Sequence, residues 1–464
     1  MPVLIGPDLT FADVIAVARH DEPVEVSEQA LTAVDRAADH VAQLADDVVP
    51  HYGISTGFGA LASKRVPVEQ RAILQHSLIR SHAASTGAEV EREVIRAMML
   101  LRLKTMASGH TGVRREVVLG YAAMLNTGIT PVTGEYGSLG CSGDLAPLAH
   151  AALALTGEGI VRDKAGTQMP AAEALSAAGL EPITLREKEG LALINGTDGM
   201  LGQLIMALTD LDTLVTTADL TTAMTVQALC GIDAVFAPDL QALRPHEGQK
   251  LSAANIAALL KDSPLIQAGK SEESKRVQDA YSLRCAPQVT GAVRDTMAHA
   301  AHVAQVELVS AIDNPAVTDD LRVESNGNFH GAPVAYVLDF LAIAVADLAS
   351  MSERRTDRML DPARSRGLNA FLANDPGVDS GYMIAQYTQA SIVSELKRLA
   401  VPASADSIPT SAMQEDHVSL GWSAARKLRR AVDGLGKVLG VEALTAARAI
   451  DMRGIGASEP VARV

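Results

Sequence analysis

Three consecutive residues, Cys141-Ser142-Gly143, could together form an electrophile from the chain itself. Gly143 has no Cβ, so its backbone nitrogen can approach a neighbouring carbonyl closely. Attack on the carbonyl of residue 141, followed by the loss of two waters, one of which takes the Ser142 hydroxyl, would give a five-membered imidazolone ring with an exocyclic methylidene. The Cys141 side chain would be a substituent of this ring and would take no part in its formation. The segment therefore predicts an electrophilic centre that depends on Ser142 and Gly143.

The same segment is compatible with a second chemistry, nucleophilic hydrolysis. Residues 140–144 nearly match the Gly-x-Ser-x-Gly turn of serine hydrolases, but Asp144 stands in place of the final glycine. That turn also needs a strand before it and a helix after it. A hydrolase would draw its nucleophile and its histidine base from the set Ser142, Cys141, His150 and His330.

The composition of the 464-residue chain excludes several classes of function. The formal net charge is −15, and the chain has one Trp, seven Tyr and six Phe, whereas nucleic-acid binding favours a basic surface and aromatic stacking platforms. No phosphate-binding glycine loop, dinucleotide-binding glycine motif or His-Glu-x-x-His metal motif occurs. We therefore expect no nucleic acid, no nucleotide and no metal. Because the net charge gives an anionic substrate no long-range attraction, a substrate carboxylate must be held by a local cation.

Cysteine usage and the apolar runs predict a cytoplasmic protein with no membrane partner. The three cysteines form no Cys-x-x-Cys pair and are too few for a disulfide framework. The start of the chain lacks the cationic segment of a secretory signal and meets Asp8 and Asp13 early. Apolar runs such as residues 145–157 and 340–345 are shorter than the ~20 residues of a membrane span.

The elements that must position residues 141–143 are predicted to be mainly helical. Alternating strand patterns are rare and short, as around residues 322–325, and no strand-helix series indicates a parallel sheet. Long helices usually pack side by side in bundles. We therefore expect a mainly α fold, with a loop-rich N-terminal part over residues 1–195 and a long-helix bundle over residues 196–464. Alanine-rich stretches with helical spacing run through residues 94–106, 199–230, 289–312, 334–358, 381–400 and 417–449, the last of which could form one very long helix.

Glycine-rich polar loops separate these helices, and loops on a rigid scaffold concentrate functional residues. Their spread along the chain predicts a composite site assembled from distant segments or from several subunits. These loops are residues 51–59, 134–144, 195–199, 278–287 and 326–331.

The segment from Gly137 to His150, GSLGCSGDLAPLAH, resembles the signature of the aromatic amino acid ammonia-lyase family. Members of this family build a methylidene-imidazolone (MIO) from Ala-Ser-Gly, so Cys141 departs from the pattern whereas Ser142 and Gly143 keep it. The resemblance implies an MIO formed from Cys141-Ser142-Gly143 and a long-helix bundle of the ammonia-lyase/fumarase-like type. Seven further motifs match in order: YGISTGFG at Tyr52, RSHAAS at His82, LINGTDG at Asn195, RPHEGQ at His246, VQDAYSLRCAPQ at Gln278, SNGNFHGAP at Phe329 and SAMQEDHVS at Glu415.

Two positions resemble the members of the family that act on histidine. One is the Ser81-His82 pair, and the other is Glu415, where phenylalanine-specific members tend to carry an amide. An imidazole has two ring nitrogens that each need a partner when desolvated, and a phenyl ring would leave both partners unpaired at ~1–3 kcal/mol each. The resemblance therefore implies a carbon–nitrogen lyase that eliminates ammonia from L-histidine to give trans-urocanate.

The resemblance also implies roles for the other site residues. Arg284 is expected to clamp the substrate carboxylate, because its planar fork binds carboxylates bidentately. Tyr52 is the expected base for the β-proton, with Glu415 as the rival. Asn195 is expected to donate to the ring oxygen. The remaining residues at substrate- or MIO-contacting positions are Gln278, Tyr281 and Phe329.

The family resemblance implies a homotetramer in which loops from different subunits complete each site. Two alternatives stay open. One is an MIO lyase or aminomutase that acts on tyrosine or phenylalanine, and the other is a catalytically silent scaffold that keeps the helical assembly. A substrate panel separates the first alternative, and intact mass separates the second, because an MIO-bearing chain is lighter by two waters.

Overall fold

The computed structural model describes residues 2–271 and 276–463, which fold into two compact units. Unit 1 comprises Met1–Met206, His302–Tyr336 and Ala403–Arg426, and unit 2 comprises Ala207–Ala301, Val337–Pro402 and Lys427–Val464. The expectation of a mainly α fold is confirmed. The predicted division into residues 1–195 and 196–464 stays a prediction. Each compact unit draws on three separate segments of the chain.

Unit 1 combines short helices with four small sheets. The parallel pair β1–β2, the antiparallel pairs β3–β5 and β8–β9, and the three-stranded sheet β4–β6–β7 tie its loops together. Its elements are β1 (Val3–Ile5), α1 (Phe11–His20), β2 (Val24–Val26), α2 (Glu28–Ala45), η1 (Gly59–Leu61), α3 (Val68–His82), β3 (Thr86–Glu89), α4 (Arg92–Ala107), α5 (Arg115–Thr127), β4 (Thr130–Pro131), β5 (Gly134–Tyr136), α6 (Leu145–Leu155), β6 (Ile160–Arg162), β7 (Gln168–Pro170), α7 (Ala171–Ala177), α8 (Glu189–Ala192), β8 (Ala316–Val317), β9 (Val323–Glu324) and η4 (Ser411–Met413).

Local sequence explains where the first helices begin. The Thr10 side chain accepts a hydrogen bond from the Asp13 backbone N–H, and the Asp13 carboxylate accepts one from the Thr10 N–H, which forms a capping box at the start of α1. The Ser27 side chain caps α2 by accepting from the Ala30 N–H. Such caps satisfy backbone donors that a helix leaves free at its N-terminus.

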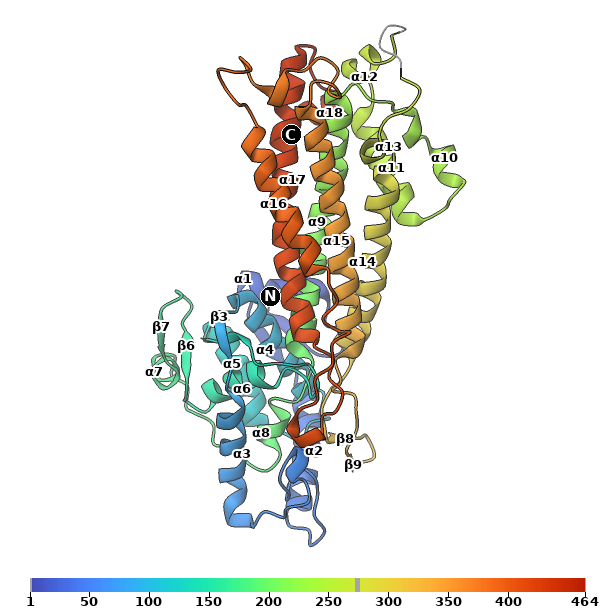
Figure 1. Ribbon diagram of the computed structural model, residues 1–464. Coiled ribbons are helices and arrows are strands. Elements are labelled where there is room, and N and C mark those ends of the chain that lie inside the picture. Colours follow the sequence, from blue (N-terminus) through green and yellow to red (C-terminus); the bar gives the residue numbers. More distant parts are fainter. Residues whose placement is uncertain (1, 272–275, 464) are drawn as a thin grey trace. The chain divides into compact units, whose positions relative to one another are not determined.

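Unit 2 is dominated by long helices that run side by side (Figure 1). Four of them, α9 (Asp198–Ala228), α14 (Ala286–Val309), α15 (Ala332–Leu360) and α17 (Gly421–Arg453), contribute residues to both units. They bear out the long helical stretches expected from the sequence, including the very long one near the C-terminus. The other elements are η2 (Ala234–Phe236), α10 (Pro238–Ala242), α11 (Glu247–Leu260), α12 (Pro264–Ala268), α13 (Tyr281–Arg284), η3 (Ala370–Leu372), α16 (Met383–Leu399) and α18 (Glu459–Ala462).

The bundle core follows the helical periodicity of α17. Leu428, Val432, Leu435 and Leu439 recur at helical spacing, and all four are buried. Within the same core a fully buried ion pair joins Arg355 of α15 to Glu442 of α17, with Nε 2.5 Å from Oε1. The apolar stripe and the ion pair together fix the register of these two helices.

One helix among the described residues, α15, is long and apolar enough to cross a membrane. The apolar run at residues 340–345, which by itself is shorter than a membrane span, is part of this longer apolar segment. Its apolar window is 61% buried inside the protein, as in the core helix of a bundle.

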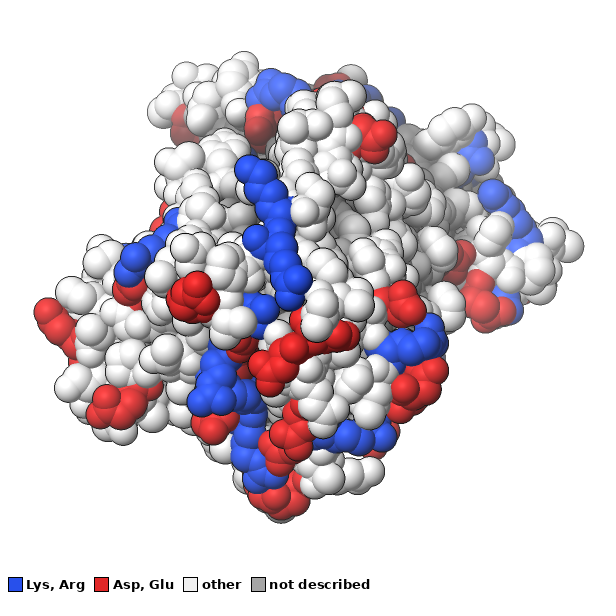
Figure 2. Space-filling view, turned by 90° about the horizontal axis from the view of Figure 1, so that it is seen from below, with Lys and Arg blue, Asp and Glu red and all other residues white. Residues whose placement is uncertain are grey.

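Charged side chains of both signs are interspersed on the face shown in Figure 2.

Candidate active site

The loop that carries residues 141–143 leaves no room for a side chain at Gly143. Gly140 and Gly143 both have positive φ, +66° and +82°, in the left-handed region that favours glycine. A Cβ on Gly143 would lie 2.2 Å from the Gly196 carbonyl oxygen. The same carbonyl accepts a hydrogen bond of 2.7 Å from the Asp144 N–H. The backbone at Gly143 is thus held in a tight, glycine-specific conformation against the predicted loop at residues 195–199.

The predicted loop at residues 326–331 and the residues just before α17 hold the carbonyl that precedes this segment. Residues 417–420 were predicted to be helical, but α17 begins at Gly421. The Gly140 carbonyl accepts hydrogen bonds from the Gly331 N–H at 3.0 Å and from the Ser419 hydroxyl at 2.8 Å. The Leu420 N–H donates to the Leu139 carbonyl at 2.8 Å. The structure therefore brings together three loops that lie far apart in the sequence.

The Glu415 carboxylate is in direct contact with the 141–143 segment. The Ser142 hydroxyl donates to Glu415 Oε1 at 2.7 Å, and the Cys141 thiol lies 3.3 Å from Oε2. Thr410 donates to the same Oε2 at 2.9 Å. Thr410 was not among the predicted site residues, although it lies just before the SAMQEDHVS motif.

The Cys141 thiol is buried and is no candidate nucleophile. It packs in an apolar cluster with Val418 and Leu420. Burial, and then the neighbouring Glu415 carboxylate, raise the pKa of Cys141 to about 12. Because the thiolate is the reactive form, this environment disfavours the cysteine-hydrolase alternative.

The serine-hydrolase alternative also lacks its base. The Ser142 hydroxyl donates to Glu415, whereas the His150 Nε2 lies 2.8 Å from the Ser85 hydroxyl. His330 stacks on His417 with ring centroids 5.3 Å apart. Among the described residues, then, neither proposed histidine is the hydrogen-bond partner of Ser142.

Asp144 is a buried acid that was not among the predicted site residues. Its carboxylate accepts from the Ser138 hydroxyl and from the Met200 N–H, both at 2.8 Å. Complete burial raises the pKa of Asp144 to about 7, although these hydrogen bonds act to lower it. Its position at the start of α6, directly after Gly143, was the signal that could have identified it.

Asn195 lies on the predicted loop that Gly143 packs against. Its Nδ2 donates to the Asn314 carbonyl at 2.8 Å. Its Oδ1 is buried and has no hydrogen-bond partner among the described residues. The second Nδ2 proton is available for another acceptor.

His82 and Tyr52 lie on separate elements of unit 1. The His82 Nδ1 lies 2.8 Å from the Leu78 carbonyl, one turn earlier in α3. A carbonyl can only accept, so this contact places the proton on Nδ1 and leaves Nε2 as an acceptor. The Tyr52 hydroxyl accepts from the Gly59 N–H at 3.2 Å. No hydrogen bond joins His82, Tyr52 or the half-buried Phe329 to residues 141–143 within the described part of the chain.

Gln278, Tyr281 and Arg284 belong to unit 2. The Arg284 guanidinium lies over the Tyr281 ring, 4.6 Å from its centroid, and its Nε donates to the Asp279 carbonyl at 2.9 Å. The two terminal nitrogens of Arg284 make no hydrogen bond to any residue that the structure describes. Tyr281 and Gln278 are exposed. This short segment therefore presents a cation whose outer edge can receive an anion.

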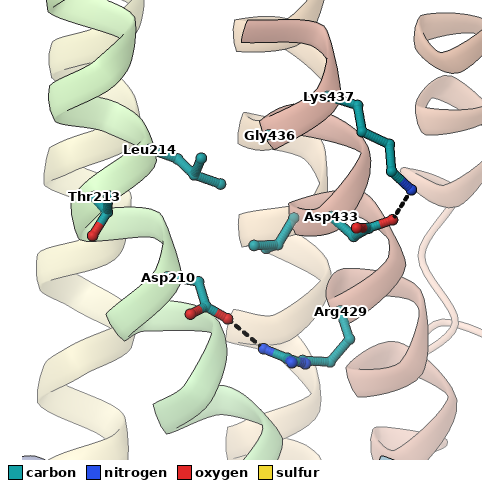
Figure 3. A pocket seen from close by; sticks show the side chains of 8 residues that line it. Asp210, Thr213, Leu214, Arg429, Asp433, Gly436 and Lys437 are labelled. Carbon is teal, nitrogen blue, oxygen red and sulfur yellow. Dashed lines mark hydrogen bonds and ion pairs between the residues drawn. The ribbon is translucent and has the colours of Figure 1, made fainter. Parts of the chain in front are cut away.

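Unit 2 also has a surface pocket. It is formed by α9 and α17, where Asp210 pairs with Arg429 at 2.6 Å and Asp433 pairs with Lys437 at 2.6 Å (Figure 3). None of the residues predicted for the site lines it. We therefore place the candidate site at the 141–143 loop rather than in this pocket.

Comparison with known proteins identifies the family of this chain. The profile of the family described as "Aromatic amino acid lyase" matches residues 9–463. A histidine ammonia-lyase of Streptomyces coelicolor is 64% identical over 97% of this chain and 88% of its own length. The histidine ammonia-lyase of Trypanosoma cruzi superimposes with a TM-score of 0.91 at 38% identity, over 100% of this chain and 87% of that one. The tyrosine aminomutase of Streptomyces globisporus superimposes with a TM-score of 0.92, also at 38% identity, over 98% and 89% of the two chains. The chain belongs to the aromatic amino acid lyase family.

Proposed function

We propose that this chain is a histidine ammonia-lyase, which eliminates ammonia from L-histidine to give trans-urocanate. A relative named histidine ammonia-lyase is 64% identical to this chain over nearly the whole length of both proteins. The observation that carries the proposal is the hydrogen bond of 2.7 Å from the Ser142 hydroxyl to Glu415. In this contact the Glu415 carboxylate, which could accept an N–H of an imidazole, lies against the serine that would become part of the electrophile.

We propose that the electrophile is the MIO formed from Cys141-Ser142-Gly143. The residues fit this group, because Gly143 occupies a left-handed conformation in a space that a Cβ would fill. Cys141 is compatible with ring formation, because only its backbone carbonyl takes part. The group supplies an electrophilic methylidene that accepts electrons from the substrate and makes the amine a better leaving group.

Glu415 and His82 are the proposed partners of the substrate imidazole. Loss of the Ser142 hydroxyl during cyclisation removes the donor that Glu415 Oε1 now binds, and so frees that oxygen for a substrate N–H. His82 presents Nε2 as an acceptor, because its Nδ1 is engaged by the Leu78 carbonyl. A protonated imidazole has one N–H for each of these two acceptors, whereas a phenyl ring has none and would leave both unpaired, which disfavours phenylalanine.

Arg284 is the proposed carboxylate clamp, since its terminal nitrogens have no partner among the described residues and its ring contact with Tyr281 fixes the guanidinium plane. Tyr52 is the proposed base for the β-proton, with Glu415 as the rival. Asn195 is proposed to donate its second Nδ2 proton to the MIO oxygen. Gln278, Tyr281 and Phe329 are proposed to contact the substrate or the MIO.

We propose a homotetramer, because the site residues of unit 2 lie on a segment that exposes Tyr281 and Gln278, as loops that complete a neighbour's site would. Light scattering on a size-exclusion column tests this state, and a monomeric active enzyme would contradict it. A cytoplasmic location remains our prediction from the cysteine usage.

A substrate panel tests the proposed function. Purified protein is mixed with L-histidine, L-tyrosine or L-phenylalanine, and the near-UV absorbance of the conjugated acid is followed. We expect a rise with L-histidine alone. A rise with tyrosine or phenylalanine instead would retain the MIO and refute the roles given to His82 and Glu415.

A further inference from the structure

The short segment Asp313-Asn314-Pro315 contacts loops that carry three of the proposed site residues. The Asn314 carbonyl accepts from the Asn195 side chain at 2.8 Å. The Pro315 ring lies against Gly53, where an added Cβ would come within 3.3 Å of the proline Cδ. Gly53 directly follows Tyr52, so the segment supports both the Asn195 loop and the Tyr52 loop.

The side chain of Asn314 holds a third loop. Its Oδ1 accepts from the Ser325 hydroxyl at 3.0 Å and from the Asn326 N–H at 2.9 Å. The Asn326 amide in turn donates to the Asp313 carbonyl at 3.0 Å. This loop continues to Phe329 and ends at Gly331, whose N–H binds the Gly140 carbonyl next to residues 141–143.

Buried charged side chains hold the Asp313-Asn314-Pro315 segment in place. Lys188 and Asp313 form an ion pair with Nζ 2.5 Å from Oδ2, and both side chains are fully buried. Lys188 also donates to the Thr111 carbonyl at 2.7 Å, and Arg102 donates to the Ile312 carbonyl at 2.7 Å. A buried ion pair is expensive to desolvate, and its best-attested benefit is a unique register. Here it fixes the position from which Asn314 reaches both loops.

We propose that Asn314 is a positioning residue for the reaction. Its carbonyl orients the Asn195 amide, because only the NH₂ end of that amide can face a carbonyl. Its side chain holds residues 325–331, which carry Phe329. One residue thus sets the geometry on two sides of the 141–143 loop. The kinetic test of this role rests on the proposed function, whereas the measurement of amide hydrogen exchange in residues 325–331 does not.

Asn314→Ala tests the side-chain contacts while keeping the backbone carbonyl. Asn314→Asp is the conservative variant, because a carboxylate oxygen can still accept from Ser325 and Asn326. Asn126→Ala is the matched control in the same unit, since it also removes two hydrogen bonds, both to Val24 and at 2.7 and 3.0 Å. Each variant is compared by amide hydrogen exchange, intact mass, thermal midpoint, kcat and KM for L-histidine.

In Asn314→Ala we expect exchange in residues 325–331 to accelerate about tenfold and kcat/KM to fall about tenfold or more. The loss of two waters should persist, Asn314→Asp should restore both readouts to near wild type, and Asn126→Ala should change neither. Should Asn314→Ala fail to fold, Ser325→Ala removes one donor to the same oxygen and should accelerate exchange in that loop and lower kcat/KM by a smaller factor.

Unchanged exchange in residues 325–331 of the folded variant, or equal kinetic losses in Asn314→Ala and Asn126→Ala, would overturn the proposal. A wild-type protein that exchanges normally but does not convert L-histidine would count against the proposed function alone. In that case the exchange comparison still decides the role of Asn314.

Discussion

The Ser142 hydroxyl donates a hydrogen bond of 2.7 Å to the Glu415 carboxylate, although 273 positions separate the two residues in the sequence. The other carboxylate oxygen is held by Thr410 at 2.9 Å, which fixes the orientation of the group. In the proposed cyclisation Ser142 loses this hydroxyl, and the Glu415 oxygen that it now binds would become free for the substrate. The contact would then connect the formation of the electrophile with the recognition of the amino acid.

Gly143→Ala should block ring formation. The alanine Cβ would lie 2.2 Å from the Gly196 oxygen, and the alanine backbone would have to adopt a left-handed conformation. We expect the intact mass of the variant to retain both waters and its lyase activity to be lost. Gly440→Ala, a helical position with nothing within 4 Å of the added Cβ, is the control and should keep the mass loss and the activity. A Gly143→Ala chain that still lacks two waters would contradict the steric argument.

Glu415→Gln should lower kcat for L-histidine by about two orders of magnitude or more, because an amide is a poor proton acceptor and binds the imidazole less strongly. Steady-state kinetics with L-histidine measure this effect. The control is Glu395→Gln, which removes a carboxylate from an exposed ion pair with Arg398 and should leave kcat unchanged. Equal kcat values for Glu415→Gln and wild type would remove Glu415 from the reaction.

Arg284→Lys keeps the positive charge and loses the planar fork that binds a carboxylate through two parallel hydrogen bonds. We expect KM for L-histidine to rise about tenfold while the two-water mass loss persists. Arg398→Lys on the exposed face of α16 serves as the control. If KM does not change in Arg284→Lys, a different cation holds the substrate carboxylate.

Stability should depend on pH through Asp144. Burial raises the pKa of Asp144 from 3.8 to about 7, so the folded state favours the protonated carboxyl. The stability that this group contributes is fully present below about pH 4 and is lost as the pH rises through about 7. The difference in unfolding free energy between wild type and Asp144→Asn should therefore fall by up to about 1.4 kcal/mol per pH unit over that range. Denaturant titrations from pH 4 to pH 8 measure it, and parallel pH profiles for the two proteins would contradict the assignment.

The long helices could be predicted from the sequence because each combines alanine-rich composition with helical spacing. Residues 417–449 illustrate this, since α17 covers Gly421–Arg453. The shorter helices of unit 1 were harder to predict, because their starts depend on caps such as Thr10 with Asp13 rather than on a long apolar stripe.

The sequence predicts the site residues that belong to a motif. It does not predict the contacts between residues that lie far apart in the chain. The proposed roles of Ser142, Gly143 and Glu415 follow from residue type and resemblance. The Gly196 carbonyl against Gly143 and the Ser419 hydroxyl on Gly140 could not be predicted, because both contacts arise from the packing of loops in three dimensions. Asp144 belongs to the motif, but its raised pKa of about 7 follows from its complete burial, which the sequence does not reveal.

The most direct test of the account is the release of ammonia and of a near-UV-absorbing acid from L-histidine by wild type and Ser142→Ala, with the intact mass measured on the same samples. We predict that the wild-type chain is lighter than its sequence mass by two waters and forms both products, and that Ser142→Ala retains the waters and forms neither. Product formation by a Ser142→Ala chain of unaltered mass would contradict the claim that the electrophile is made from Cys141-Ser142-Gly143.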